Sequence, residues 1–147
     1  MSAEDVKKLR EMTGAGVMDS KNALEDAGGD FEKAAALLKE RGLAKADKKA
    51  GRELGSGLVD VYVHNDRVGV LVNVSCETDF VARSEDFRDL VHNIAMQVAA
   101  MNPKDVHELM EQAYIKDEKE TISDLVKGAI AKIGENIRIE EFTRYEI

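Results

Sequence analysis

The spacing of apolar residues divides the chain into a helical first part and a mixed second part. Within residues 1–42, apolar side chains recur every three or four positions in three short blocks, which predicts three helices. Glycine-rich breaks separate the blocks, and the capping residues Ser2 and Asp30 precede the first and the third. A bundle of this size buries little surface, so we expect it to be only marginally stable alone.

Residues 58–76 show the two-residue alternation that is typical of β-strands. Valine occupies every second position over residues 59–63 and again over residues 68–74. Between these runs, Asn65-Asp66 has the chemistry of a tight turn, so the segment predicts a β-hairpin. We expect the valines of both strands to face the helices.

That orientation leaves a small set of apolar side chains on the outer face of the predicted sheet. They are either a contact surface, as exposed apolar patches often are, or ordinary scattered surface residues. The sequence alone leaves both interpretations open for Leu58, Tyr62 and Leu71.

Helical spacing returns twice after the hairpin. It runs from a cap at Ser84 to Asn102-Pro103, and again over residues 121–134, whereas residues 104–118 are only helical in part. Residues 137–147 alternate as a last strand, and the alternation slips at Glu140-Glu141, which indicates a bulge.

These elements predict an α+β protein with two unequal parts. Residues 1–42 form an N-terminal three-helix module, and residues 43–57 are a helical linker that frays into a loop. In residues 58–147, a three-stranded antiparallel sheet packs its inner face against helices.

The corner segment, residues 76–81, joins the second predicted strand to the next helix and reads Cys-Glu-Thr-Asp-Phe-Val. Thr78 and Asp79 have oxygens that can accept hydrogen bonds from the free N–H groups of a starting helix. Phe80 follows on the first turn, where its ring either covers the end of the core or stands out as a contact for a partner.

Charge is unevenly distributed along the chain. The net charge is −8, yet residues 1–50 carry ten basic and ten acidic side chains, so the excess lies in residues 51–147. Such a surface repels phosphate backbones and argues against nucleic-acid binding, whereas a protein partner with a basic or mixed face fits it. The single cysteine, the absence of a membrane-spanning apolar run and the acidic N-terminus indicate a cytoplasmic protein.

No pattern in the sequence indicates catalysis, a metal site or a cofactor. The three histidines, His64, His92 and His107, lie on separate elements without ligand spacing, and Cys76 ends a valine strand on its buried side. Residues 14–16 form a short Gly-Ala-Gly loop that lacks the strand and the Lys-Ser/Thr pair of a phosphate-binding loop. We therefore expect a binding protein, not an enzyme.

Three segments resemble signatures of the elongation factor Ts family, in the family's order. Residues 6–24 (VKKLREMTGAGVMDSKNAL) are similar to its N-terminal signature, and residues 68–82 (VGVLVNVSCETDFVA) to its second. Residues 131–137 (AKIGENI) are similar to a third stretch. The first three helices also resemble ubiquitin-associated modules.

This resemblance implies a guanine-nucleotide exchange factor for elongation factor Tu, bound in its GDP and nucleotide-free forms. In the family, the corner segment reaches the Mg²⁺ and phosphate site of the GTPase, with Phe80 as a wedge between helices. The contacts that the resemblance implies are Thr78, Asp79, Phe80 and Val81 in the corner segment and Lys7, Arg10, Val17 and Met18 in the N-terminal module.

The chain also departs from the family pattern. It has one sheet region where long members have two related subdomains, and it has Asn93 and Gln97 where the family can have histidines. Short members can pair through their sheets, which implies a homodimer here. The last strand has Thr143 where some dimers have a cysteine, so this dimer would be non-covalent.

Two other functions remain open at this level. The first 42 residues could act as a stand-alone module for a ubiquitin-like or other small partner, or an enzyme site could have escaped recognition. The Thr-Asp-Phe-Val sequence of the corner segment favours the exchange factor, because a bare adaptor has no use for it.

Overall fold

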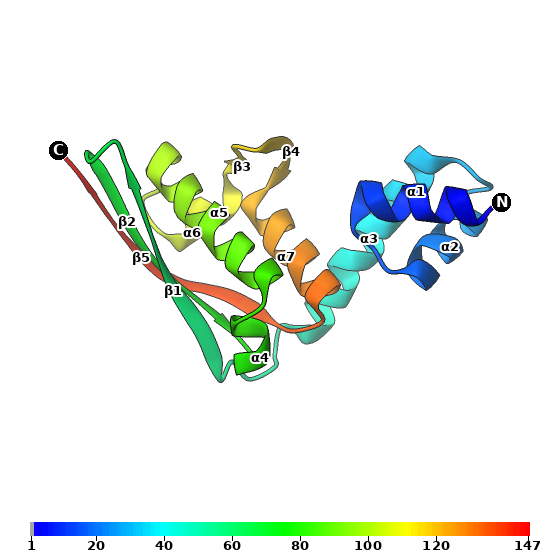
Figure 1. Cartoon of the computed structure of the whole chain (residues 1–147), viewed down its shortest axis with the longest axis horizontal. Coiled ribbons are helices and arrows are strands. Elements are labelled where there is room, and N and C mark those ends of the chain that lie inside the picture. Colours follow the sequence, from blue (N-terminus) through cyan, green and yellow to red (C-terminus); the bar gives the residue numbers. More distant parts are fainter. Residues whose placement is uncertain (1) are drawn as a thin grey trace.

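A computed structural model describes residues 2–147, and it has the α+β architecture that the sequence predicts (Figure 1). The helices are α1 (Ala3–Thr13), α2 (Val17–Asp26), α3 (Phe31–Lys49), α4 (Asp79–Ala82), α5 (Glu85–Met101), α6 (Val106–Glu111) and α7 (Ile122–Ile133). The strands are β1 (Ser56–His64), β2 (Val68–Cys76), β3 (Ala113–Tyr114), β4 (Asp117–Thr121) and β5 (Ile137–Glu146).

The N-terminal module consists of α1, α2 and the first half of α3. Ser2 and Asp5 form a complete capping box at the start of α1, and the Asp30 carboxylate caps α3, so these local predictions are confirmed. A small separate core lies between the three helices, with Leu9 and Leu24 fully buried.

Helix α3 does not end with the module. It runs on to Lys49 through the segment predicted as a fraying linker, and its Ala46 is buried in the large core. The second half of α3 packs along α7, where Gly42 lies directly against Ala131 (Figure 1). The ion pair between Lys39 and Asp124, at 3.7 Å, crosses the same seam.

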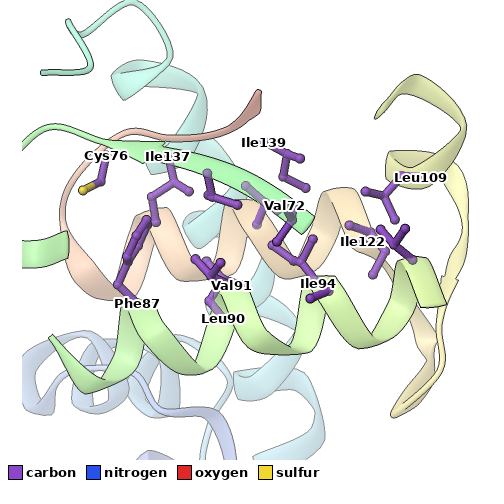
Figure 2. Packing of buried hydrophobic residues seen from close by; sticks show 14 of the residues in the cluster. Val72, Cys76, Phe87, Leu90, Val91, Ile94, Leu109, Ile122, Ile137 and Ile139 are labelled. Carbon is purple, nitrogen blue, oxygen red and sulfur yellow. The ribbon is translucent and has the colours of Figure 1, made fainter. Parts of the chain in front are cut away.

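The main sheet has the strand order β1-β2-β5, and both pairings are antiparallel. Helices α5, α6 and α7 all lie on one side of it, and the large core fills the space between (Figures 1 and 2). The register of β2 against β5 skips Glu140, which confirms the predicted bulge. The opposite face of the sheet is covered by no element of residues 2–147.

The hairpin between β1 and β2 has a different register from the predicted one. Its loop comprises residues 65–67, and His64 pairs with Val68. A two-residue turn at Asn65-Asp66 would have paired Val63 with Val68 and placed the valines of both strands on one face. The third loop residue shifts the pairing by one, and a one-residue shift reverses every side chain of a strand.

The side-chain orientation predicted for β1 is therefore wrong. Leu58 and Tyr62 are partly buried and pack on the large core, so they do not lie on the outer face. The odd-numbered valines of β1 lie on the outer face instead, since Val59, Val61 and Val63 are 57–61% exposed. In β2 the prediction holds, because Val70, Val72 and Val74 are buried, Val68 is partly buried against the core, and Leu71 points outward.

The segment between α5 and α7 contains a small hairpin that the sequence pattern did not reveal. Its strands, β3 and β4, are held to α5 by Gln97, whose side chain is fully buried. The amide nitrogen of Gln97 donates to Gln112 Oε1 and to the Ala113 carbonyl, and its oxygen accepts from the Ile115 N–H at 2.9 Å. Gln97 thus faces the interior and is not available to a partner.

Candidate functional site

The corner segment turns the chain from β2 into α4, a helix of four residues at one end of the sheet (Figure 1). Thr78 is its N-cap, because the hydroxyl oxygen accepts from the Val81 N–H at 3.3 Å. Ser84 caps the following helix α5 in the same way, with Phe87 as its donor. Two successive caps therefore set a sharp direction for the few residues between them.

The aromatic side chain of the corner segment points into solvent. Phe80 is 83% exposed, which excludes the interpretation that it covers the end of the core. Its neighbour Val81 is only 7% exposed and packs in the large core, so the Val81 side chain anchors α4 and offers almost no surface to a partner. Of the four residues that the resemblance implied here, Thr78, Asp79 and Phe80 are exposed.

The carboxylate of Asp79 is held from a neighbouring strand. The hydroxyl of Ser56, the first residue of β1, donates a hydrogen bond to Asp79 Oδ1. The same carboxylate lies in the first turn of α4, where a negative charge is favourable beside free N–H groups. Asp79 is thus oriented before any partner arrives.

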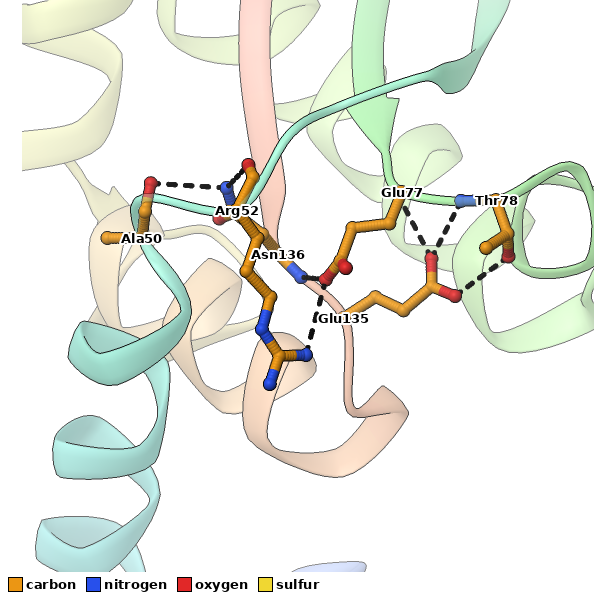
Figure 3. A network of polar contacts seen from close by, with 6 residues as sticks. All are labelled: Ala50, Arg52, Glu77, Thr78, Glu135 and Asn136. Atoms are coloured by element: carbon orange, nitrogen blue, oxygen red, sulfur yellow. Dashed lines mark hydrogen bonds and ion pairs between the residues drawn. The ribbon is translucent and has the colours of Figure 1, made fainter.

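A second carboxylate, which the sequence analysis did not single out, binds the other side of the corner segment (Figure 3). Glu135 Oε1 accepts from the backbone N–H groups of Glu77 and Thr78, and Glu135 Oε2 accepts from the Thr78 hydroxyl. We call this arrangement the Glu135 clamp. Its only signal in the sequence is that Glu135 lies in the third stretch that resembles the family.

Cys76 lies directly before the corner segment turns and is fully buried. Burial raises the pKa of its thiol, and the nearby Glu135 carboxylate raises this pKa further. A buried thiol with a raised pKa is a poor nucleophile, because the thiolate is the reactive form. The structure therefore agrees with a core role for Cys76.

The residues implied in the N-terminal module are all exposed. Lys7 and Arg10 are exposed on α1, and Val17 and Met18 are 51% and 61% exposed at the start of α2. The guanidinium of Arg10 donates to the Ala15 carbonyl at 3.3 Å, which holds the loop between the two helices.

Lys132 of α7 lies between the N-terminal module and the start of α5. Its side chain lies beside Gly14 in the loop between α1 and α2, and its Nζ is 3.9 Å from Asp86 Oδ1 in the first turn of α5. The side chain of Lys132 therefore spans from the N-terminal module to the first turn of α5, the helix that follows the corner segment.

The outer face of the sheet carries a second group of exposed apolar side chains. Of the three residues predicted there, only Leu71 is present, at 48% exposure. The valines of β1 and Tyr145 of β5 complete the group, since Val61 pairs with Leu71 and Gly69 pairs with Tyr145 across the strands. We call Val59, Val61, Val63, Leu71 and Tyr145 the outer-face patch.

His64 and His92 both lie beside the Tyr62 ring, whereas His107 is on a separate helix. His64 bonds to the Tyr62 hydroxyl, His92 lies 3.2 Å from Asp60, and His107 faces Glu111 on its own helix. Among residues 2–147, no three histidine, cysteine or carboxylate side chains are grouped so that they could hold a metal ion. Within the same residues, none of the helices has the length and apolar character needed to cross a membrane.

Comparison with known proteins covers the whole chain. The family described as elongation factor TS matches residues 77–147, which include most of the corner segment and the Glu135 clamp. The elongation factors Ts of Thermotoga petrophila and Moorella thermoacetica are both 44% identical to the full chain, over 96% and 95% of their own lengths. That of Coprothermobacter proteolyticus is 42% identical, over 98% of its length.

The alignments also show that this chain is shorter than these relatives. The one with Thermotoga petrophila spans 191 positions, whereas the chain has 147 residues, so at least 44 positions are occupied in the relative alone. Identity of 44% over 100% of the chain nevertheless leaves no doubt about kinship. The chain belongs to the elongation factor Ts family.

Proposed function

We propose that this chain promotes the release of GDP from elongation factor Tu by inserting Phe80 beside the Mg²⁺ and phosphate site of the GTPase. As a member of its family, the chain is a translation elongation factor. The observation that carries the exchange mechanism is the 83% exposure of Phe80 on a short helix between the capping residues Thr78 and Ser84. The other three phenylalanines of the chain are buried or partly buried, so this ring is set apart for contact.

The thermodynamic basis of such an activity is reciprocal coupling between two ligands of one GTPase. If the exchange factor weakens the binding of GDP to the GTPase, then GDP must weaken the binding of the exchange factor by the same ratio. The proposed partner is therefore bound both in its GDP form and, more tightly, without nucleotide. No step requires this chain to make or break a covalent bond, so it acts without enzymatic chemistry or a cofactor of its own.

The energy needed is larger than one side chain can supply. Weakening the affinity of the GTPase for GDP by about 10⁴-fold needs roughly 5.5 kcal/mol of differential binding free energy. Full burial of a phenylalanine contributes about 1.5–3 kcal/mol. The rest must come from a wider surface, for which the exposed Lys7, Arg10, Val17 and Met18 of the N-terminal module are the candidates.

The test is the rate at which fluorescent GDP leaves purified elongation factor Tu, measured with and without this chain in the presence of excess unlabelled GDP. We expect the rate to rise with the concentration of the chain and to saturate. An unchanged rate across the whole concentration range would contradict the proposed function.

We further propose that the outer-face patch pairs with the same patch of a second copy, which gives a non-covalent homodimer. The patch brings five apolar side chains together on a face that no other described element covers. Its centre is Val61 beside Leu71, and the residue opposite Leu71 on β5 is Thr143. A two-fold axis through this centre would bury apolar surface from both copies at once.

Sedimentation equilibrium tests this pairing. We expect a dimer mass for the wild type at micromolar concentration and a monomer mass for Val61→Lys, because a lysine there would be desolvated at the centre of the interface. Val61→Thr keeps the β-branched shape without a charge and is the matched control. A monomer mass for the wild type at high micromolar concentration would exclude the dimer.

A further inference from the structure

The exposed Phe80 needs support from outside its own helix. Helix α4 has only four residues, and isolated helices of fewer than about 12 residues are unstable in water. Val81 and Ala82 fix its inner side in the core, yet they do not determine the angle at which the chain enters the helix. That angle is set by residues 77 and 78, where the strand has ended and the helix has not begun.

The Glu135 clamp acts at these two residues. A single carboxylate takes three donors, with distances of 3.1 Å from Glu77 N, 3.0 Å from Thr78 N and 2.7 Å from Thr78 Oγ1. Hydrogen bonds to an ionised acceptor are roughly twice as strong as neutral ones. Glu135 therefore fixes both the backbone and the side chain of the N-cap.

The clamp also determines how the Thr78 hydroxyl is used. A hydroxyl has one proton to donate, and here it is directed to Glu135. The lone pairs of the oxygen are then free for the Val81 N–H, which is the capping bond of α4. Without the carboxylate, the hydroxyl can rotate and the cap loses its fixed orientation.

Glu135 is itself held firmly. Gly134 ends α7 in the left-handed conformation, with φ of 89°, and directs Glu135 toward the corner segment. The next residue, Asn136, donates its N–H to the Glu77 carboxylate, so the two segments bond in both directions (Figure 3). The Asn136 side chain also donates to the carbonyls of Ala50 and Arg52, just after α3.

We propose that Glu135 is a positioning residue for nucleotide exchange, which sets the direction of Phe80 without itself contacting the GTPase. Because the Asn136 bonds reach the end of α3, the same network ties the corner segment to the helix that carries the N-terminal module. This inference rests on the proposed exchange function, but its structural part can be tested without the GTPase.

The decisive experiment is a double-mutant cycle of Glu135→Ala and Phe80→Ala, with the stimulation of GDP release from elongation factor Tu as the readout. We expect Glu135→Ala alone to reduce the stimulation about tenfold, and to change it less than about twofold when Phe80 is already alanine. A purely structural loss, or a direct contact of Glu135 with the GTPase, would reduce the stimulation equally in both backgrounds and would overturn the proposal.

Two further variants control the cycle. Glu135→Gln should retain an intermediate stimulation, because its amide oxygen accepts from the two backbone N–H groups but its NH₂ cannot accept from the Thr78 hydroxyl. Glu118→Ala removes the same charge from an exposed position on strand β4, away from the corner segment, and should act like the wild type. A Glu135→Gln variant as inactive as Glu135→Ala would contradict the hydrogen-bonding role.

Amide hydrogen exchange tests the Glu135 clamp independently of the proposed role in nucleotide exchange. In the free protein, Glu135→Ala should accelerate exchange at the Thr78 and Val81 amides about tenfold or more, whereas Phe80→Ala should not. If the wild type fails to stimulate GDP release while this result is obtained, the proposed function is wrong and the clamp stands. If exchange at both amides is unchanged, the clamp is wrong whatever the GTPase assay gives.

Discussion

Replacing Gln97 by leucine tests whether the buried amide of α5 holds the small hairpin β3-β4. Gln97 is fully buried and makes three hydrogen bonds, two as donor and one as acceptor. Leucine has a similar volume but leaves the Ile115 N–H and the Ala113 carbonyl without these partners. An unsatisfied buried polar group costs about 1–3 kcal/mol. Because Ala113 and Ile115 lie at the surface and water can replace part of the lost bonding there, we expect a total loss of about 2–4 kcal/mol.

The assay is thermal unfolding followed by circular dichroism. In a domain of this size, 1 kcal/mol corresponds to about 2–4 °C, so Gln97→Leu should lower the Tm by about 5–15 °C. Lys116→Ala is the control, because it breaks only the exposed bond to Asn93 and should cost less than about 0.5 kcal/mol. An unchanged Tm for Gln97→Leu would refute the reasoning.

The same variant distinguishes a structural role from a partner contact. The resemblance implies a family histidine at the position of Gln97, and the structure turns the Gln97 side chain to the hairpin, away from solvent. At a temperature where Gln97→Leu remains folded, its stimulation of GDP release should therefore equal that of the wild type. A selective loss of stimulation would show that the amide serves the partner.

Three further substitutions test the physical account of stability. Ser20→Ala should raise the free energy of unfolding by about 1 kcal/mol in urea titrations, because the buried Ser20 hydroxyl has no hydrogen-bond partner among residues 2–147. Gly57→Ala should lower it by about 1–3 kcal/mol, since a Cβ there would lie 2.6 Å from the carbonyl oxygen of Val74. Burial raises the pKa of the Glu120 carboxyl, and the nearby Asp117 carboxylate raises it further. Ionisation of Glu120 therefore disfavours the fold, and the stability of the wild type falls as pH rises through this raised pKa. Glu120→Gln should remove this fall and be more stable than the wild type at pH 7.

Local chemistry was predictable from the sequence. The caps at Ser2, Asp30, Thr78 and Ser84 all form as expected, because a cap and its donor lie within three residues of each other. The slip in alternation at Glu140 was equally local, and the bulge is present.

Features that depend on long-range register were not predictable in the same way. The outer-face patch was assigned partly to the wrong residues because one extra loop residue, Arg67, reverses β1, and nothing in the alternation itself shows the length of the loop. The hairpin β3-β4 is too short to produce a periodic signal and depends on Gln97, which is distant in sequence.

The candidate site divides along the same line. The exposed position of Phe80 followed from the capping pattern once the resemblance had favoured a partner. In the Glu135 clamp, Glu135 is 58 positions from Glu77 and 57 positions from Thr78, and no spacing rule connects them. Such a contact becomes visible only when the end of α7 is placed beside the end of β2.

The most direct test of the central claim compares Phe80→Ala with Met101→Ala in the release of fluorescent GDP from elongation factor Tu. Met101 is an exposed apolar residue at the opposite end of α5, about 25 Å along the helix from its start beside the corner segment. Both variants should keep the Tm of the wild type, because neither side chain is buried.

We expect Phe80→Ala to lose most of the stimulation and Met101→Ala to keep it. Loss of the roughly 1.5–3 kcal/mol that burial of the ring contributes corresponds to a decrease of about 10- to 100-fold in the stimulated rate of GDP release. A Phe80→Ala variant that folds normally and stimulates release as strongly as the wild type would contradict the claim that this exposed ring directs nucleotide exchange.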